Sequence, residues 1–303
     1  MTSRHSPFSI WLWAVRPRTL PLAAASSILA YGLASLQGSA SLAVFLLVLL
    51  TALLLQILSN LANDYGDAAS GADTDERLGP TRMVSSGLAS PAQMFRAVML
   101  AALLASLSGL ALVLTATWGR WPLLLFFLGL GLISIVAAVA YTMGKRPYGY
   151  IGLGDFMTCI FFGPVAVLGG AVLCGANLTS ILWLPALAAG LCTTAVLNIN
   201  NIRDIDTDRA TGKLTVAARL GLERARCYHA GLIVAVMLLW LCFCLNVNPR
   251  MLPGLAFGLP LMRSTWLVVT RAGEPACLNA QLRATVLSSA FLGLGMAVLC
   301  LAL

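Results

Sequence analysis

Charged residues are scarce in this chain. Asp, Glu, Lys and Arg together make up only 10% of its 303 residues, against about 25% in an ordinary soluble domain. Hydrophobic residues make up 59%, and the mean hydropathy is +0.90. This composition excludes a soluble globular protein and predicts one that lies in the lipid bilayer. Because no polar stretch is long enough for a separate soluble domain, we expect a single membrane domain over residues 1–303.

Metal-binding patterns of cysteine and histidine are also missing. His5 and His229 stand alone, and the eight cysteines form no Cys-x-x-Cys pair and no Cys/His ligand spacing. Most of the cysteines lie in apolar stretches, which is typical of small buried hydrophobic residues. The net charge of +8 would suit nucleic acid, but no basic run with interleaved aromatic residues occurs. We therefore expect no zinc site and no nucleic-acid partner.

Long apolar runs fill most of the sequence instead. A membrane-spanning helix needs about 20 apolar residues, and the runs with their breakers predict nine spans. They lie at 20–37, 40–60, 92–117, 121–142, 154–175, 179–200, 228–247, 251–270 and 281–302. The tryptophans and arginines before the first run resemble an interfacial segment rather than a signal peptide, so we expect that segment to be retained. The expected fold is an all-α membrane protein with about nine transmembrane helices.

The basic residues report the topology of these spans. Arg120 and Arg250 alone lie in the short connections, whereas almost all others of the 19 lysines and arginines lie in the long connections or before the first span. Basic residues favour the cytoplasmic side of a membrane. We therefore expect the N-terminus and the long connections inside and the C-terminus outside.

The acidic residues gather in two of the long connections, which hold eight of the chain's 11. Both connections carry one repeated pattern, Asn63-x3-Asp67-x3-Gly71 and Asn200-x3-Asp204-x3-Asp208-x3-Gly212. Each pattern stands at the cytoplasmic end of a span, the second and the sixth. This repeat suggests two copies of a helical unit whose polar ends face each other.

Oxygen ligands at this spacing suit magnesium. Residues at i and i+4 share one face of a helix, so each motif presents an amide oxygen and carboxylates in one line. Carboxylate and amide oxygens without His or Cys are typical of magnesium that shares its coordination with phosphate oxygens. The predicted ligands are Asn63, Asp67, Asp73, Asn200, Asp204 and Asp208, with Asp64 as a competitor of Asp73. The alternative is that the acids only solvate the loops and pair with nearby arginines; the repeated spacing favours the metal.

A diphosphate bound to this metal also needs cationic contacts. Four basic residues flank the same side and are predicted to bind it, namely Lys145, Arg146, Arg203 and Arg82. Neutralising a diphosphate makes it a better leaving group, so an allylic C–O bond can ionise and an electron-rich ring can attack the cation. Tyr141 and Tyr148 offer ring faces to the cation or hydrogen bonds to the acceptor, whereas Tyr150 fits an interfacial aromatic belt.

Taken together, these motifs resemble the UbiA superfamily of intramembrane aromatic prenyltransferases, and in particular its branch of 1,4-dihydroxy-2-naphthoate polyprenyltransferases of menaquinone synthesis. The resemblance covers essentially the whole chain. It is carried by RPRTLPLA at 16–23, SNLANDYGDAASGAD at 59–73, YTMGKRPYGYIGLGD at 141–155 and LNINNIRDIDTDRATGK at 197–213. The general superfamily pattern has its third ligand at the position of Gly71, and Asp73 is the natural substitute.

The resemblance implies a helical bundle around a central cavity, with a lateral opening for the prenyl tail and a polar cytoplasmic cap. It implies a bacterial cytoplasmic (inner) membrane, an active site that faces the cytoplasm, and dependence on magnesium. Asp67 and Asp204 are the implied catalytic residues, and Arg16 resembles a basic residue near the acceptor or the diphosphate. The implied reaction prenylates the ring carbon that bears the carboxylate, with loss of carbon dioxide and diphosphate, and yields demethylmenaquinol.

Other functions remain open at this stage. A related prenyltransferase could act on another acceptor, such as 4-hydroxybenzoate, homogentisate or haem. A cation-coupled transporter also combines repeated spans with acidic residues, but its acids should lie near the middle of the bilayer rather than at the ends of the spans. A CDP-alcohol phosphotransferase would need a DGxxAR-type signature, which the sequence lacks.

Overall fold

Helices account for almost all of the chain. The computed structural model describes residues 6–38, 40–71, 79 and 81–303. In chain order the helices are α1 (Pro7–Val15), η1 (Pro17–Thr19), α2 (Leu20–Ser35), α3 (Leu42–Ala69), α4 (Pro91–Thr117), α5 (Trp121–Ala140), η2 (Tyr148–Ile151), α6 (Gly154–Ile160), η3 (Phe161–Gly169), α7 (Gly170–Leu173), η4 (Ser180–Leu182), α8 (Trp183–Arg203), α9 (Ile205–Ala210), α10 (Val216–Leu220), α11 (Leu222–Val247), η5 (Pro249–Gly258), α12 (Leu259–Arg271) and α13 (Pro275–Leu301). The predicted all-α fold is confirmed over these ranges.

Eight of the described helices are long and apolar enough to cross a membrane, so the chain is a multi-pass membrane protein. They are Leu42–Ala69, Pro91–Thr117, Trp121–Ala140, Gly154–Leu173, Ser180–Arg203, Leu222–Val247, Pro249–Arg271 and Pro275–Leu301. The first predicted span, 20–37, forms α2, which has only 16 residues. At 1.5 Å per residue it reaches about 24 Å, against about 30 Å of hydrocarbon. A crossing by α2, and with it the count of nine, therefore stays a prediction.

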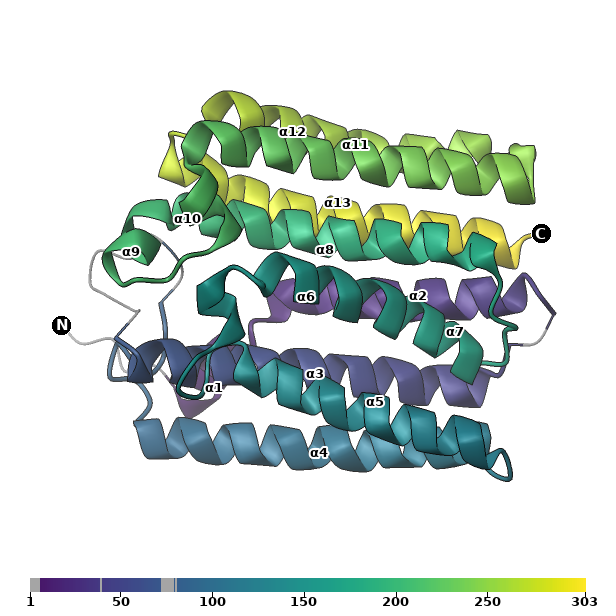
Figure 1. Cartoon of the computed structure of the whole chain (residues 1–303), viewed down its shortest axis with the longest axis horizontal. Helices are drawn as coiled ribbons and strands as arrows, with labels where there is room; N and C mark the ends of the chain where they lie inside the picture. Colours follow the sequence, from purple (N-terminus) through teal and green to yellow (C-terminus); the bar gives the residue numbers. More distant parts are fainter. Residues whose placement is uncertain (1–5, 39, 72–78, 80) are drawn as a thin grey trace.

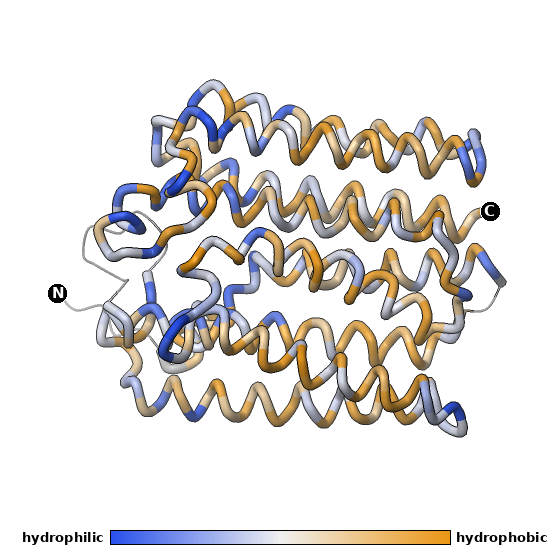
Figure 2. Tube along the Cα trace, viewed as in Figure 1, coloured by the Kyte–Doolittle hydropathy of each residue, from blue (hydrophilic) through white to orange (hydrophobic). Residues whose placement is uncertain are grey.

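The long helices lie side by side along one common direction (Figure 1). The short helices α1, α9 and α10 gather at one end of the bundle, and α13 ends at the opposite end, where the C-terminus is marked. Figure 2 shows hydrophilic residues at both ends, most of all around α9 and α10, and hydrophobic residues along the middle. We call α9, α10 and the connection 141–153 the polar cap.

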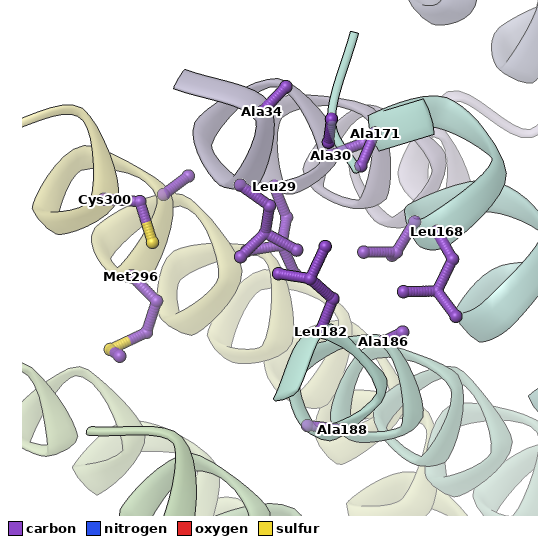
Figure 3. Close-up of a cluster of buried hydrophobic side chains, with 14 of the residues drawn as sticks. Leu29, Ala30, Ala34, Leu168, Ala171, Leu182, Ala186, Ala188, Met296 and Cys300 are labelled. Carbon is purple, nitrogen blue, oxygen red and sulfur yellow. The ribbon is translucent and has the colours of Figure 1, made fainter. Parts of the chain in front are cut away.

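Small residues bring the helices into close contact. A Cβ added at Gly32 of α2 would lie 2.9 Å from the carbonyl oxygen of Ala297 on α13, and one added at Gly163 of η3 would lie 2.6 Å from that of Ala186 on α8. Buried side chains from α2, α7, α8 and α13 form one cluster (Figure 3), among them Leu29, Ala171, Ala186 and Met296. Helices in lipid associate by such close packing because lipid tails are as apolar as their side chains. This packing fixes α8, which carries the second motif.

Candidate active site

The two Asn/Asp motifs lie at the polar-cap ends of α3 and α8. Asn63 and Asp67 are one turn apart on α3, close to its C-terminal end. Asn200 lies in the last turn of α8, Asp204 at the bend after it, and Asp208 on α9. The backbone N–H of Asp208 donates to the carbonyl oxygen of Asp204 at 2.8 Å, so the helical spacing continues across the bend. Both motifs thus have the helical spacing that the sequence predicts.

Asp67 is buried and has two side-chain partners. Arg82 Nη2 donates to its Oδ2 at 2.6 Å, and the hydroxyl of Tyr150 donates to its Oδ1 at 2.8 Å. Arg82 is itself only 7% exposed, so this ion pair is shielded from water. Tyr150, expected as an interfacial belt residue, thus also contacts the first motif directly through its hydroxyl.

Asp204 is held by its neighbour in the chain. Arg203 donates from Nε to Oδ1 at 2.7 Å and from Nη2 to Oδ2 at 2.6 Å, a two-pronged ion pair. The same guanidinium donates to the side-chain oxygen of Asn200 at 2.7 Å and to that of Asn279 on α13 at 3.0 Å. Arg203 therefore ties two members of the second motif to the start of α13.

Lys213 connects the second motif to the first. Its Nζ lies 3.7 Å from Asp208 Oδ1 and 5.4 Å from the centre of the Tyr150 ring. Tyr150 in turn donates to Asp67, so the contacts lead from one motif to the other through two side chains. The sequence interpretation missed Lys213, although it directly follows Gly212 at the end of the second motif.

The carboxylates of both motifs act on one another electrostatically. Burial raises the pKa of Asp208 to about 6; the Lys213 ammonium opposes this shift, and the carboxylates of Asp204 and Asp67 add to it. Burial raises the pKa of Tyr141 as well, with the Asp67 carboxylate as the next cause. Each motif therefore lies within electrostatic reach of the other. Carboxylate and amide oxygens are hard donors, and this donor set fits a divalent cation such as magnesium.

The described residues do not complete a metal site by themselves. Within the described ranges, no three carboxylate, histidine or cysteine side chains lie together in a group that could hold a metal ion. Asp73, the predicted third ligand of the first motif, lies outside the described residues. A cation here would therefore also need amide oxygens, such as those of Asn63 and Asn200, or oxygens from a bound ligand.

A cavity of about 550 Å³ adjoins the motifs. Its charged lining comes from near the cap, together with other polar residues, and includes Arg16, Arg18, Asn63, Asp67, Arg82, Tyr141, Tyr148, Asn200 and Lys213. Its remaining walls are largely apolar and come mainly from α2 to α5 and from the helix 154–173, with a smaller part from α8 and α13, including Leu112, Phe127, Phe161, Val165 and Leu173. The cavity therefore joins a charged head region to a long apolar channel between the helices.

The predicted binding residues divide into three groups in the structure. Arg82, Arg16, Tyr141 and Tyr148 line the cavity. Arg203, Asp204 and Asp208 are buried near it but are not among its lining residues. Lys145 and Arg146 are exposed on the polar cap and do not line it either. The rings of Tyr141 and Tyr148 meet edge to face with centroids 5.4 Å apart, and the Tyr148 hydroxyl donates to the carbonyl oxygen of Ala137 at 2.8 Å.

The carboxylate of Asp64 contacts backbone N–H groups rather than the side chains that surround Asp67. Its Oδ2 accepts from the backbone N–H of Met83 at 2.9 Å, and its Oδ1 accepts from that of Val84 at 3.0 Å. Both carboxylate oxygens are thus used to hold the segment that contains Arg82. This arrangement indicates a structural task for Asp64, which its place in the sequence motif does not reveal.

A multi-pass helical bundle whose cavity joins an acidic and basic head region to an apolar channel defines an integral membrane protein for amphiphilic ligands. The sequence profile described as the UbiA prenyltransferase family matches residues 22–287, and the chain belongs to this family. It is 46% identical over 278 residues to the 1,4-dihydroxy-2-naphthoate octaprenyltransferase of Escherichia coli (strain K12), which covers 91% of this chain and 90% of that protein.

Solved structures share the fold at much lower identity. A UbiA homolog from Aeropyrum pernix K1 in its apo form superposes with a TM-score of 0.70 at 19% identity, over 91% of this chain and 97% of that one. A UbiA homolog from Archaeoglobus fulgidus bound to DMAPP and Mg2+ has a TM-score of 0.57 at 17% identity, over 90% and 97% of the two chains. The bundle is thus the fold of this family.

Proposed function

We propose that this chain transfers a polyprenyl group from polyprenyl diphosphate to 1,4-dihydroxy-2-naphthoate, with release of carbon dioxide and diphosphate, and so forms demethylmenaquinol in menaquinone synthesis. The observation that carries the proposal is the cavity, which is polar and charged near the cap and apolar along its remaining length. A substrate with an anionic head and a long hydrocarbon tail matches both parts. The name and the extent of the Escherichia coli relative support this acceptor.

We assign magnesium to the oxygen donors of both motifs, namely Asn63, Asp67, Asp73, Asn200, Asp204 and Asp208. Magnesium, when bound there, neutralises the diphosphate and makes it a better leaving group. Asp67 and Asp204 are the catalytic members, one in each motif: Asp67 lines the cavity, and Asp204 is buried four residues after Asn200, which also lines it. The Mg2+ bound in the Archaeoglobus fulgidus homolog supports the assignment.

Three cations, the buried Arg82 and Arg203 and the partly buried Lys213, are suited to bind the diphosphate directly. Arg82 and Arg203 each hold a motif carboxylate at 2.6 Å, close enough to reach an anion bound beside that carboxylate. Lys213 lines the cavity and joins this set. Lys145 and Arg146 are exposed on the polar cap, where they attract the anionic head toward the cavity rather than hold it.

The chemistry then proceeds within the apolar part of the cavity. The allylic C–O bond breaks, its electron pair leaves with the diphosphate, and the ring carbon that bears the carboxylate attacks the allylic cation. The carboxylate departs as carbon dioxide, and its bonding pair restores the aromatic ring, so no base has to remove a ring proton. Tyr141 and Tyr148 present ring faces to the cation, Arg16 holds the carboxylate, and the apolar walls exclude water.

The same proposal includes a location. The whole chain, residues 1–303, acts as one domain in the bacterial cytoplasmic (inner) membrane, with the polar cap and the active site toward the cytoplasm. α2 is the ninth crossing. The basic residues of the long connections support this orientation. The positions of α1 and of the end of α13 also support this orientation. They lie at opposite ends of the bundle, as an odd number of crossings requires (Figure 1).

Purified protein with magnesium and a long-chain polyprenyl diphosphate tests the function against a panel of aromatic acceptors. We expect prenylation of 1,4-dihydroxy-2-naphthoate, with carbon dioxide released in a one-to-one ratio to prenyl transfer, and no product from 4-hydroxybenzoate or homogentisate. The acceptor is labelled at its carboxylate carbon, and products are identified by mass. Label retained in the prenylated product contradicts the mechanism, because the carboxylate must leave when the ring carbon that carries it is attacked.

A further inference from the structure

Arg16 has an unusual backbone conformation. Its φ is +55° and its ψ is 66°, and it is the one non-glycine residue with a positive φ in the part of the chain that the structure describes. L-residues with a Cβ avoid this left-handed region because the Cβ lies too close to the following carbonyl oxygen, whereas glycine adopts it freely. Strained backbone of this kind persists where the surrounding structure holds it in place. An arginine at this position therefore indicates a use for its side chain.

The peptide groups before and after Arg16 are held by two residues, Asn60 and Thr19, whose side chains also contact each other. Asn60 on α3, only 3% exposed, donates from Nδ2 to the carbonyl oxygen of Val15 at 2.8 Å, which fixes the peptide group before Arg16. Thr19 donates from both its hydroxyl and its backbone N–H to the carbonyl oxygen of Arg16, each at 3.0 Å, which fixes the peptide group after it. Asn60 Nδ2 also donates to Thr19 Oγ1 at 3.0 Å.

Gln56, one turn earlier on α3, fixes the orientation of the Asn60 amide. Its Nε2 donates to Asn60 Oδ1 at 3.2 Å and to Thr19 Oγ1 at 3.4 Å. Asn60 Oδ1 therefore faces Gln56, and Asn60 Nδ2 faces the Arg16 turn. We call Gln56, Asn60 and Thr19 the Arg16 clamp. It connects α3, whose first motif begins three residues after Asn60, to the turn that brings Arg16 to the cavity wall.

We propose that Asn60 is a positioning residue, which acts through Thr19 and the Val15 carbonyl to hold Arg16 where it binds the carboxylate of the aromatic acceptor. The proposal rests on the proposed function. Arg16 lines the cavity in its charged head region, and an anion is the ligand that a guanidinium binds there. The prenyl diphosphate head is the other anion available. We favour the carboxylate because Arg82, Arg203 and Lys213 already serve the motifs where the diphosphate would lie.

A double-mutant cycle tests whether Asn60 acts through Arg16. The variants are Arg16→Gln, Asn60→Ala and the two combined, each purified and checked for thermal unfolding and for a single species in size-exclusion chromatography. We expect each single variant to raise the KM for the acceptor about tenfold or more, which is the effect of losing one hydrogen bond to a charged group. The KM for prenyl diphosphate should stay unchanged. In the Arg16→Gln background, Asn60→Ala should have no further effect.

Thr19 supplies a matched pair of variants that preserves the size of the side chain. Thr19→Val removes the hydroxyl and should raise the KM for the acceptor as Asn60→Ala does. Thr19→Ser keeps the hydroxyl and should have the KM of the wild-type protein. If Asn60→Ala does not fold, Thr19→Val takes its place in the cycle.

Two results would overturn the proposal. One is a double variant in which the two effects multiply, since Asn60 would then act independently of Arg16. The other is a rise in the KM for prenyl diphosphate in place of that for the acceptor. Failure of the proposed function is distinguishable from both: the wild-type protein would then turn over a different acceptor, and the same cycle would be run with that acceptor.

Discussion

Gly66 on α3 offers a sharp test of how the first motif is positioned. It lies between Asn63 and Asp67, on the side of α3 that touches the connection after α5. A Cβ added to Gly66 would lie 2.6 Å from both the carbonyl oxygen and Oγ1 of Thr142, and 2.7 Å from its carbonyl carbon. Thr142 itself donates to the carbonyl oxygen of Ala62 at 3.0 Å and to Asn63 Oδ1 at 3.2 Å. Gly66→Ala therefore forces α3 and this connection apart at the motif.

The size of the effect follows from these distances. Non-bonded heavy atoms meet at about 3.5 Å, so the backbone of Thr142 and α3 must separate by roughly 0.9 Å. Overpacking of this kind costs about 1–3 kcal/mol, and the better helix propensity of alanine offsets at most about 1 kcal/mol of it. We expect a net destabilisation of about 1–2 kcal/mol. A displacement of nearly 1 Å at a catalytic group reduces turnover about 100-fold, so activity should fall far more than stability.

The assay compares Gly66→Ala with Gly129→Ala. Gly129 is also a helical glycine, on α5, but a Cβ added there has nothing within 4 Å, and it does not line the cavity. Gly129→Ala should keep wild-type turnover and unfold at the same or a slightly higher temperature. Turnover is measured at saturating magnesium and substrates, and unfolding by heating in detergent. Wild-type turnover and unfolding temperature in Gly66→Ala would refute the close approach of α3 to Thr142.

Asp67→Ala and Asp204→Ala should each abolish turnover while the protein still inserts into the membrane, because each removes a carboxylate from one motif; an active Asp204→Ala enzyme would rule out a site made of both motifs. Asp64→Asn should cost about 1–3 kcal/mol of stability, because the amide nitrogen then faces a backbone N–H, and should leave the magnesium requirement unchanged; a higher magnesium requirement would identify Asp64 as a ligand. A reporter fused after Leu303 should behave as periplasmic and one placed between Gly79 and Ser90 as cytoplasmic, and a periplasmic result for the second would reverse the orientation.

Hydropathy and residue spacing predict the larger features of the molecule. The apolar runs predict where each long helix lies, because burial in lipid requires long uninterrupted stretches. The largest error is at α3, which ends at Ala69 rather than at 60. The helices α11 and α13 begin at Leu222 and Pro275 rather than at 228 and 281. In each case the additional turns are more polar than the apolar run, yet helical. The Asn-x3-Asp spacing likewise predicts the helical placement of both motifs, because it is set by local geometry.

The parts that the sequence does not predict depend on contacts between distant segments. Tyr150 binds Asp67 across 83 positions of the chain. Asn60 reaches the carbonyl oxygen of Val15, next to Arg16, across 45 positions. Asp64 matches the pattern of a metal ligand but holds the backbone at Met83 and Val84, because the next loop folds back onto it. Residue type and spacing name the candidates, and only the tertiary structure divides them between chemistry and support.

The room around the glycines differs from one helix contact to the next. Where α2 meets α13, and where η3 meets α8, an added methyl group would collide with backbone, so these helices have no room to slide. On α5, neither Gly129 nor Gly131 has any neighbour within 4 Å of an added Cβ. An added methyl group on α5 would therefore meet open space, which at Gly131 is the cavity that this glycine lines. The backbone contacts of α2, η3, α8 and α13 instead hold these helices in one fixed register, and α8 carries the second motif within that packing.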